Sequence, residues 1–407
     1  MPFIFNPYSL DSYFPKDTVV VFESSNENIV KVNEAGMITA VAEGFASISV
    51  KVFMDDKATY FSKSVSISVK DPYVTQGPVL QNYFGLGGVV NIPESLAITE
   101  IGQYAFSNFE YIMKTEEELA FDDAETSKAW FIGDNTITKV VLPEGVEKIN
   151  AYAFANLTAL EEIVLPSTLT AIEYGAFYNC SSLKKITFSG ENNVIIINQH
   201  AFEGCDLEGT IDLSAACVIS DYAFAGNRDL TGIVTGDTLL SISQYAFAGC
   251  RSLKDVTITS KLVKYGAYAF TGCESLETFT VNALVLPEGM FYEAENLKKV
   301  TIGADVNEIG EFAFRDTSVE TFEVLAGNKA YQVGTKNYVL SADGKTLVAV
   351  APTFSGTFTA EHIDGAAVTT IGAGAFSHNE DITSVDLPHV TVVEAQAFAS
   401  SKKLAKV

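Results

Sequence analysis

One short pattern recurs along most of this chain: an Ala-Phe pair that returns at intervals of about 23 residues. An apolar residue precedes the Phe by five positions in nearly every copy, and a Leu follows it after five or six positions in most copies. In one copy Ile172 precedes Phe177 and Leu183 follows it. The Phe residues are Phe106, Phe154, Phe177, Phe202, Phe224, Phe247, Phe270, Phe314, Phe376 and Phe398, with Met290-Phe291 as an altered copy.

Each copy also carries the signals of one short strand. Ile163 and Leu165 alternate with less apolar neighbours, which predicts a strand with one buried face. Pro166 ends that strand because proline cannot donate to a ladder. With about four inward apolar residues, one copy is too small to bury a core alone, so the copies must stack. The pattern predicts a β-rich repeat solenoid, a parallel-sheet array of about eleven coils and roughly 50 Å long.

Composition excludes several classes of protein and partner. The 407 residues include 26 Lys and Arg against 51 Asp and Glu, a net charge of −25, so nucleic acid and anionic membrane surfaces are excluded as partners. Hydrophobic residues make up 47 %, which excludes a disordered chain. No signal peptide and no apolar run of ~18 residues is visible, so we expect no direct membrane insertion by this stretch.

The repeats resemble a known family. Strings such as "IEYGAFYNCSSLKKITF" and "ISQYAFAGCRSLKDVTI" are similar to the BspA-type leucine-rich repeats of bacterial surface proteins, over about residues 88–407. The resemblance implies a leucine-rich-repeat fold and a secreted or cell-surface location. It also implies a role in adhesion, with a host matrix protein or a bacterial surface protein as partner.

Residues 1–72 lack the repeat and predict a small β-sandwich. Strand-like runs of β-branched residues are separated by turn residues, a spacing typical of such folds. The string "VFESSNENIVKVNEAGMITAVAEG" resembles the group 2 bacterial immunoglobulin-like domains, shortened at its start. We therefore expect an immunoglobulin-like domain over 1–72 and a solenoid over 73–407, with insertions at 107–136 and 325–367.

The first insertion holds the chain's only tryptophan. Trp130 and Phe131 are candidate binding residues, because insertions in repeat proteins often gather on the binding face. The alternative is that the two rings pack within their own insertion. The same segment is rich in carboxylates that suit calcium, but their spacing matches no calcium loop, and solvated acidic loops are the preferred interpretation.

The cysteines predict a buried ladder rather than a metal site. Each of four Cys residues stands three positions after a repeat Phe, where Asn occurs in other copies. Coils stacked at ~4.8 Å would spread four such thiols over about 20 Å, whereas zinc ligands lie ~2.3 Å from one ion. We expect no metal and no cofactor. The position is held by Cys180, Cys205, Cys250, Cys273, Asn227 and Asn379.

No motif points to catalysis. The four His residues are scattered, and His200 occupies a column otherwise filled mainly by Tyr, which indicates a structural role. There is no Gly-x-Ser-x-Gly elbow and no phosphate-binding loop. We therefore predict no catalytic residue and a protein that is not an enzyme.

The outward residues of the strands form the candidate binding surface. In the register of Ile163 and Leu165, one outward column is made of small β-forming residues with few charges. Its Thr members Thr187, Thr257, Thr280 and Thr301 are candidate binding residues, and a plain solvent-facing ladder is the alternative. The column comprises Val164, Thr187, Asp212, Val234, Thr257, Thr280, Thr301 and Glu323.

These features favour a non-enzymatic interaction or adhesion protein, extracellular or at the cell surface. It would bind a protein partner through the solenoid face and the inserted loops. Two alternatives stay open: a glycan-capture protein, which would show clustered exposed rings in the insertions, and a structural spacer without a partner.

Replacing Trp130 by Ala tests the first insertion. We expect the melting temperature to stay unchanged and binding to immobilised matrix proteins to weaken, because the ring is assigned to a partner contact. Full retention of binding would remove Trp130 from the candidate site.

Overall fold

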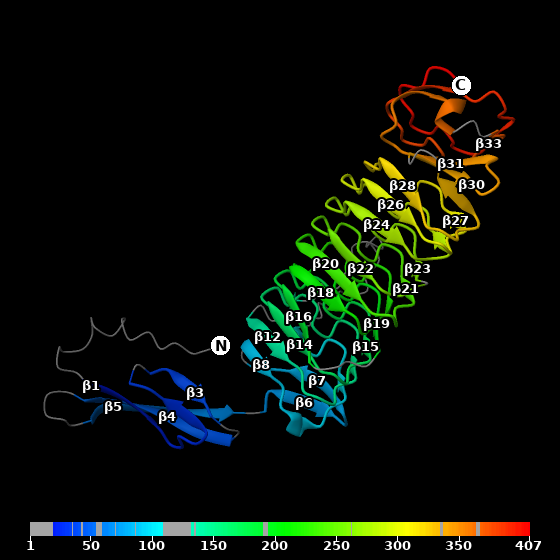
Figure 1. The fold of residues 1–407 in the computed structure, drawn as a ribbon. Helices are drawn as coiled ribbons and strands as arrows, with labels where there is room; N and C mark the ends of the chain where they lie inside the picture. Colours follow the sequence, from blue (N-terminus) through cyan, green and yellow to red (C-terminus); the bar gives the residue numbers. More distant parts are fainter. Residues whose placement is uncertain are drawn as a thin grey trace, which may run out of the picture. The chain divides into compact units, whose positions relative to one another are not determined.

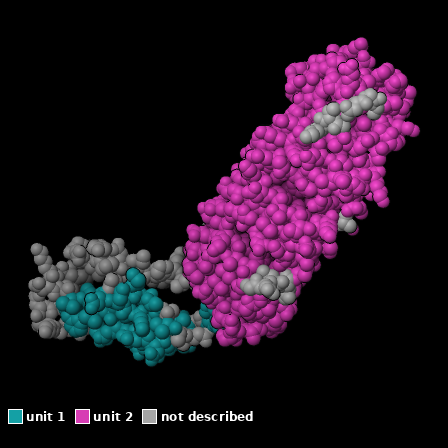
Figure 2. Space-filling model, viewed as in Figure 1, with its two compact units in different colours: residues 1–74, 83–86 teal, residues 75–82, 87–407 magenta. Residues whose placement is uncertain are grey.

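The computed structural model describes twelve stretches of the chain. Within them the residues form two compact units, which we call the amino-terminal unit (Met1–Val74 and Tyr83–Leu86) and the repeat unit (Thr75–Asn82 and Gly87–Val407), shown in Figure 2. The described residues are 19–34, 36–41, 44–53, 59–69, 71–85, 87–108, 132–133, 136–189, 194–261, 263–333, 337–363 and 367–407.

The amino-terminal unit contains two small antiparallel sheets. Strand β4 (Gly44–Phe53) lies between β1 (Val19–Ser24) and β5 (Thr59–Val69), and β2 (Val30–Val32) pairs with β3 (Ile38–Ala40). These strands follow the β-branched runs of the sequence.

A small apolar cluster joins the two sheets of this unit. Val30 from β2 packs with Ala46 and Ile48 from β4, and all three are buried. Partly buried Ile38 and Ile67 pack against this cluster. The unit thus has a hydrophobic core of its own.

The repeat unit is built from stacked coils with two parallel strand ladders, which run side by side in Figure 1. The first ladder contains the strands that carry the Ile-x-Leu pattern, such as β14 (Glu162–Leu165). Its other members are β8 (Gly88–Asn91), β12 (Ile137–Val141), β16 (Lys185–Phe188), β18 (Gly209–Leu213), β20 (Leu230–Thr235), β22 (Asp255–Ile258), β24 (Thr278–Val281), β26 (Lys299–Ile302), β28 (Thr321–Val324), β32 (Gly356–Thr359) and β34 (Ile382–Asp386).

The second ladder contains the short strands that precede the Ala-Phe pairs, two strands before the first of these, and one strand of the second insertion. Its longest sheet has nine strands and begins with β6 and β7. Its members are β6 (Tyr73–Gln76), β7 (Val79–Tyr83), β9 (Glu100–Ile101), β13 (Lys148–Ile149), β15 (Ala171–Ile172), β17 (Ile195–Ile197), β19 (Ala216–Ile219), β21 (Ser241–Ile242), β23 (Lys264–Tyr265), β25 (Val285–Leu286), β27 (Glu308–Ile309), β31 (Thr346–Val350), β33 (Thr370–Ile371) and β35 (Val392–Val393).

The Ala-Phe pairs lie in the turns between the two ladders and form a continuous ring stack. From Phe106 to Phe270, neighbouring rings are 4.7 to 5.5 Å apart between centroids and nearly parallel. The rings of this stack are buried. The backbone follows the same repeat, since the Phe154 N–H donates to the Ala176 carbonyl of the next coil at 2.8 Å. The pairs therefore set the spacing of the coils.

Both ladders are interrupted beside a cluster of aromatic rings around Phe279. Phe279 stands at the inward position that Ile163 holds in its coil, and its ring lies 5.1 Å from Phe270 and 5.0 Å from Phe291. The Phe270–Phe291 separation grows to 6.5 Å, and neither ladder continues as one sheet beyond β22 and β23. Tyr265, which replaces the usual Ile, packs against the same rings. The break in both ladders therefore coincides with a cluster of aromatic rings.

The residue three positions after a repeat Phe donates a hydrogen bond to backbone carbonyls of the turns. The Cys180 Sγ donates to the Phe154 carbonyl at 3.1 Å, and the Asn227 side-chain amide donates to the Phe202 and Phe224 carbonyls at 2.9 and 2.8 Å. All the cysteines are free thiols, and burial raises the pKa of the Cys250 thiol to about 12. The Cys250 thiol therefore remains a protonated donor, and it donates to the Phe224 carbonyl at 3.2 Å.

The two insertions affect the stack differently. The first insertion begins and ends in the short antiparallel pair β10 (Ser107–Asn108) and β11 (Ile132–Gly133). The ring stack continues past this insertion, because the ring centroids of Phe106 and Phe154 are 4.7 Å apart. The second contributes a coil of its own, because β31 pairs in parallel with β33 and β32 pairs in parallel with β34. This coil helps to bring the solenoid to about 12 turns, close to the expected eleven.

The second insertion also contains a β-hairpin. β30 (Tyr338–Ser341) pairs antiparallel with β31 around Asp343, and β29 (Tyr331–Val333) extends the sheet.

Helix is nearly absent from the described stretches, which hold the short 3-10 turns η2 (Glu94–Leu96) and η3 (Ala360–Ile363). In this part of the chain no helix is long and apolar enough to cross a membrane.

Replacing Phe247 by Ala tests the ring stack. The ring is fully buried between Phe224 and Phe270, so its loss should lower the free energy of unfolding by about 3–5 kcal/mol. Denaturant unfolding measures this change, with Phe84→Ala as the control because Phe84 is 72 % exposed. An equal, small effect of both variants would contradict the stacked register.

Candidate functional site

The candidate binding surface is the outer side of the first ladder, which we call the sheet face. The outward residues of neighbouring strands pair with one another in three separate rows. Each row belongs to a separate sheet, of four, three and three strands, rather than to one continuous sheet. The rows are Val141, Val164 and Thr187; Asp212, Val234 and Thr257; and Thr280, Thr301 and Glu323.

The four candidate Thr residues differ in exposure. Thr257 and Thr280 are exposed, and Thr187 is half-buried. Thr301 is only 9 % exposed, because the ion pair of Lys299 with Glu323, 2.9 Å between Nζ and Oε1, lies beside it. Thr301 also contacts the Glu323 carboxylate at 3.5 Å. The face therefore offers Thr257 and Thr280 most directly to a partner.

Charged side chains beside the sheet face are paired with one another. Glu162 bridges two neighbouring strands, with its carboxylate 2.8 Å from the Lys139 Nζ and 3.3 Å from the Lys185 Nζ. Hydrogen bonding to Lys139, with a smaller contribution from Lys185, holds the pKa of Glu162 below its usual range. Similar pairs between successive coils are Lys184–Glu208, Arg251–Glu274 and Lys254–Glu277.

A row of partly exposed rings lies on the turns. Six of its rings stand two residues before a repeat Phe, and Tyr174 stands three residues before Phe177. Ring centroids are 4.9 to 5.5 Å apart from Tyr104 to Tyr268, and several neighbours are stacked face to face. His200 belongs to this row: it stacks on Tyr222 at 5.1 Å and contacts the Glu203 carboxylate through Nδ1. The row comprises Tyr104, Tyr152, Tyr174, His200, Tyr222, Tyr245 and Tyr268.

Sequence reasoning did not identify this row as a surface feature. The Tyr column around His200 is visible in the sequence, but its exposure depends on how the turn is folded. Tyr152 has φ 56° and Tyr245 has φ 56°, in the left-handed region that L side chains rarely adopt. This backbone conformation places the rings outside the core. Because the rings cover much of one another's faces, the row presents mainly ring edges and hydroxyls to solvent.

The candidate residues Trp130 and Phe131 lie outside the described residues. The structure gives the two ends of their insertion, where Ser107 pairs with Gly133 and Asn108 with Ile132.

Two imidazoles of the described residues have polar partners within the fold. No group of three or more His, Cys, Asp and Glu within this part of the chain could hold a metal ion. His378 Nδ1 lies 3.1 Å from the Asp316 carboxylate. His362 Nδ1 accepts a hydrogen bond from the Thr359 N–H and makes a second one with the Thr359 hydroxyl. These partners give both imidazoles a structural position.

Comparison with known proteins gives a family match. The model of the BspA type leucine rich repeat region matches residues 124–227, 217–336 and 352–407, in six copies. A search of curated proteins finds no match.

Several solved structures are similar to the chain. A leucine-rich repeat protein of T. pallidum is 25 % identical, covering 49 % of this chain and 82 % of that one, with a TM-score of 0.40. A leucine-rich cell surface protein of Faecalibacterium prausnitzii is 16 % identical over 83 % of this chain and 94 % of that one, with a TM-score of 0.41. A leucine-rich repeat protein of Bacteroides ovatus is 19 % identical over 83 % and 93 %, with a TM-score of 0.35.

Acid should weaken the ion pairs beside the sheet face. Because the pKa of Glu162 is lower in the folded than in the unfolded chain, its stabilisation is present above the unfolded value of about 4.3. It is lost as the pH falls through the lower folded value. Glu162→Gln should therefore lower the free energy of unfolding by about 1 kcal/mol at pH 6 and have almost no effect at pH 3.

The melting temperature between pH 6 and pH 3 measures this dependence. Glu147→Gln is the matched control, because Glu147 is exposed and makes no salt bridge within the described residues. A Glu162→Gln effect that did not change with pH would contradict the ion-pair explanation.

Proposed function

The chain belongs to the BspA-type leucine-rich repeat family, and from this membership we propose that it is a non-enzymatic interaction or adhesion protein. We place it outside the cell or at the cell surface, with a host matrix protein or a bacterial surface protein as its partner. Contact would run along the sheet face and the inserted loops.

The observation that carries this proposal is the chemistry of the sheet face. Exposed Thr257 and Thr280 stand on β22 and β24, the two strands on either side of a break in the first ladder, and both side chains are small and β-branched. Such side chains have few rotamers, so a partner that packs on them costs little side-chain entropy. A face of this kind suits multipoint contact with another protein.

The charges around this face support a protein partner over a nucleic acid. Glu162 is paired with Lys139 and Lys185, so both ammonium groups already have a carboxylate partner. The remaining net charge of −25 repels phosphate backbones. It attracts partners that present basic patches, and it speeds their encounter at low salt.

The first insertion is the second part of the proposed site. It leaves the coil between Phe106 and Phe154 without disturbing the ring stack. Loops on rigid scaffolds vary in sequence with little cost to folding and often carry binding residues. We assign Trp130 and Phe131 to partner contact on this basis.

We also propose that residues 1–72 form a group 2 bacterial immunoglobulin-like module and that residues 73–407 form the repeat domain. The antiparallel sheet of β1, β4 and β5 and the separate core around Val30 support the first part. Such a module would act as a spacer beside the binding solenoid.

A screen of the full chain against immobilised matrix proteins and whole bacterial cells tests the function. The double variant Thr257→Lys and Thr280→Lys adds two long charged side chains to the sheet face and should weaken the binding found by at least about tenfold. Thr238→Lys is the matched control, because Thr238 is exposed in a turn outside that face. Equal binding by both variants would move the site elsewhere, and failure to bind any partner would support the spacer alternative.

A further inference from the structure

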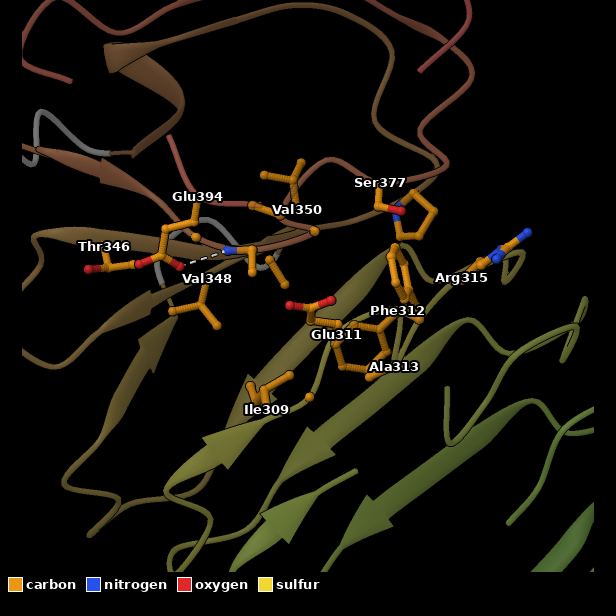
Figure 3. Close-up of a pocket in the computed structure, with 18 residues that line it drawn as sticks. Ile309, Glu311, Phe312, Ala313, Arg315, Thr346, Val348, Val350, Ser377 and Glu394 are labelled. Carbon is orange, nitrogen blue, oxygen red and sulfur yellow. Dashed lines mark hydrogen bonds between the residues drawn. The ribbon is translucent and has the colours of Figure 1, made fainter. Parts of the chain in front are cut away.

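A cavity lies where the second insertion interrupts the ring stack. It has a volume of about 230 Å³ and is bounded by the coil of Phe314, by β31 of the insertion and by the turn before Phe376 (Figure 3). The regular Phe–Phe contact is missing here, since Phe376 packs edge-on against Phe358 of the insertion. Apolar walls are supplied by Ile309, Val348, Val350 and Pro352.

The backbone at this break has donors without acceptors. In the preceding coils the Phe N–H donates to the next coil, as Phe291 does to the Ala313 carbonyl at 3.2 Å. The coil that follows Phe314 is the insertion coil, and there the Val350 N–H, not a Phe N–H, donates to the coil of Phe376, at 2.9 Å to the Ala375 carbonyl. Within the described chain the N–H groups of Phe312 and Phe314, both in the cavity wall, make no hydrogen bond.

A buried hydroxyl in the wall is also without a partner. Ser377 is 9 % exposed, and its Oγ makes no hydrogen bond with any described residue. Buried polar atoms in folded proteins are almost always paired, so an unpaired hydroxyl beside a cavity indicates a partner that enters from outside.

Two carboxylates supply acceptors at the same cavity. In Figure 3 the Glu311 carboxylate extends between the two walls, and Glu394 accepts a hydrogen bond from the Ala373 N–H at 3.0 Å on the insertion side. Arg315 also belongs to the lining, but its guanidinium is directed away from the cavity in Figure 3 and lies over the Tyr292 ring, 4.9 Å from the ring centroid. The lining therefore combines carboxylate acceptors with backbone N–H and hydroxyl donors.

We propose that this cavity binds a single neutral sugar residue, the end or a branch of a glycan. A sugar hydroxyl both donates and accepts hydrogen bonds. It therefore suits the carboxylates of Glu311 and Glu394 together with the free N–H groups and the Ser377 hydroxyl. The C–H faces of the ring pack on Val348 and Ile309.

Other ligand classes fit less well. An ammonium group would face the N–H groups of Phe312 and Phe314, and an anion would face the carboxylates of Glu311 and Glu394. The volume suits one ring, because a cavity of about 150 Å³ already holds benzene and sites for drug-sized ligands measure roughly 300–1,000 Å³. The site is separate from the sheet face and does not depend on the protein-binding proposal.

Saturation-transfer NMR on the full chain tests the site with three neutral probes: methyl glucoside, methyl galactoside and N-acetylglucosamine. The variants are Glu311→Ala, Ser377→Ala and Val348→Phe, where the last fills the cavity. Glu288→Ala is the matched control, because Glu288 holds the position of Glu311 one coil earlier and lies outside the cavity lining. The melting temperature of each variant confirms that it is folded.

Binding of at least one probe, weakened about tenfold by Glu311→Ala or Ser377→Ala, lost in Val348→Phe and retained in Glu288→Ala, supports the proposal. Binding that survives Val348→Phe would place the sugar elsewhere and overturn it. No binding by any of the three sugars would also overturn it, as would preferential binding of 1,5-diaminopentane, which would define a cation site instead.

Discussion

The structure of the repeat unit depends on contact between the Phe rings of successive coils. Each ring is buried only because the next coil covers it, so no coil of this length has a core by itself. The ring spacing near 5 Å matches the spacing of paired strands, and both ladders therefore form with the stack in place. Polar groups adapt to the same spacing: the Cys180 thiol and the Asn227 amide reach the Phe carbonyl of the preceding coil.

Departures from this stack explain the exceptional regions of the molecule. Phe279 inserts between Phe270 and Phe291, and both ladders end there and begin again. The second insertion supplies a coil with aromatic packing of a different geometry around Phe358, and a cavity with unpaired polar groups results. Where the stack is regular, the outer surface is regular as well, and the residues that face a partner repeat from coil to coil.

Much of the fold was predictable from the sequence, and less of the surface was. The period and the Ile163/Leu165 alternation predicted the solenoid, because burial of apolar residues leaves few other arrangements. The Cys ladder followed from position alone. The low exposure of Thr301 was not predictable, since it depends on the Lys299–Glu323 pair, and neither was the aromatic row, which requires a left-handed backbone at Tyr152 and its counterparts. Trp130 and Phe131, outside the described residues, remain candidates from the sequence.

The sequence by itself determined the repeat length, the strand positions and the residues of the ring stack, because these are set by local periodicity and by burial within each coil. Only the tertiary structure decided where the sheets divide, which Thr side chains are accessible and where a cavity opens. Those features depend on contacts between coils, such as Phe279 against Phe291 or Val350 against Ala375, whose partners are set by packing rather than by local pattern. A change of one ring size or one inserted segment alters them without altering the repeat.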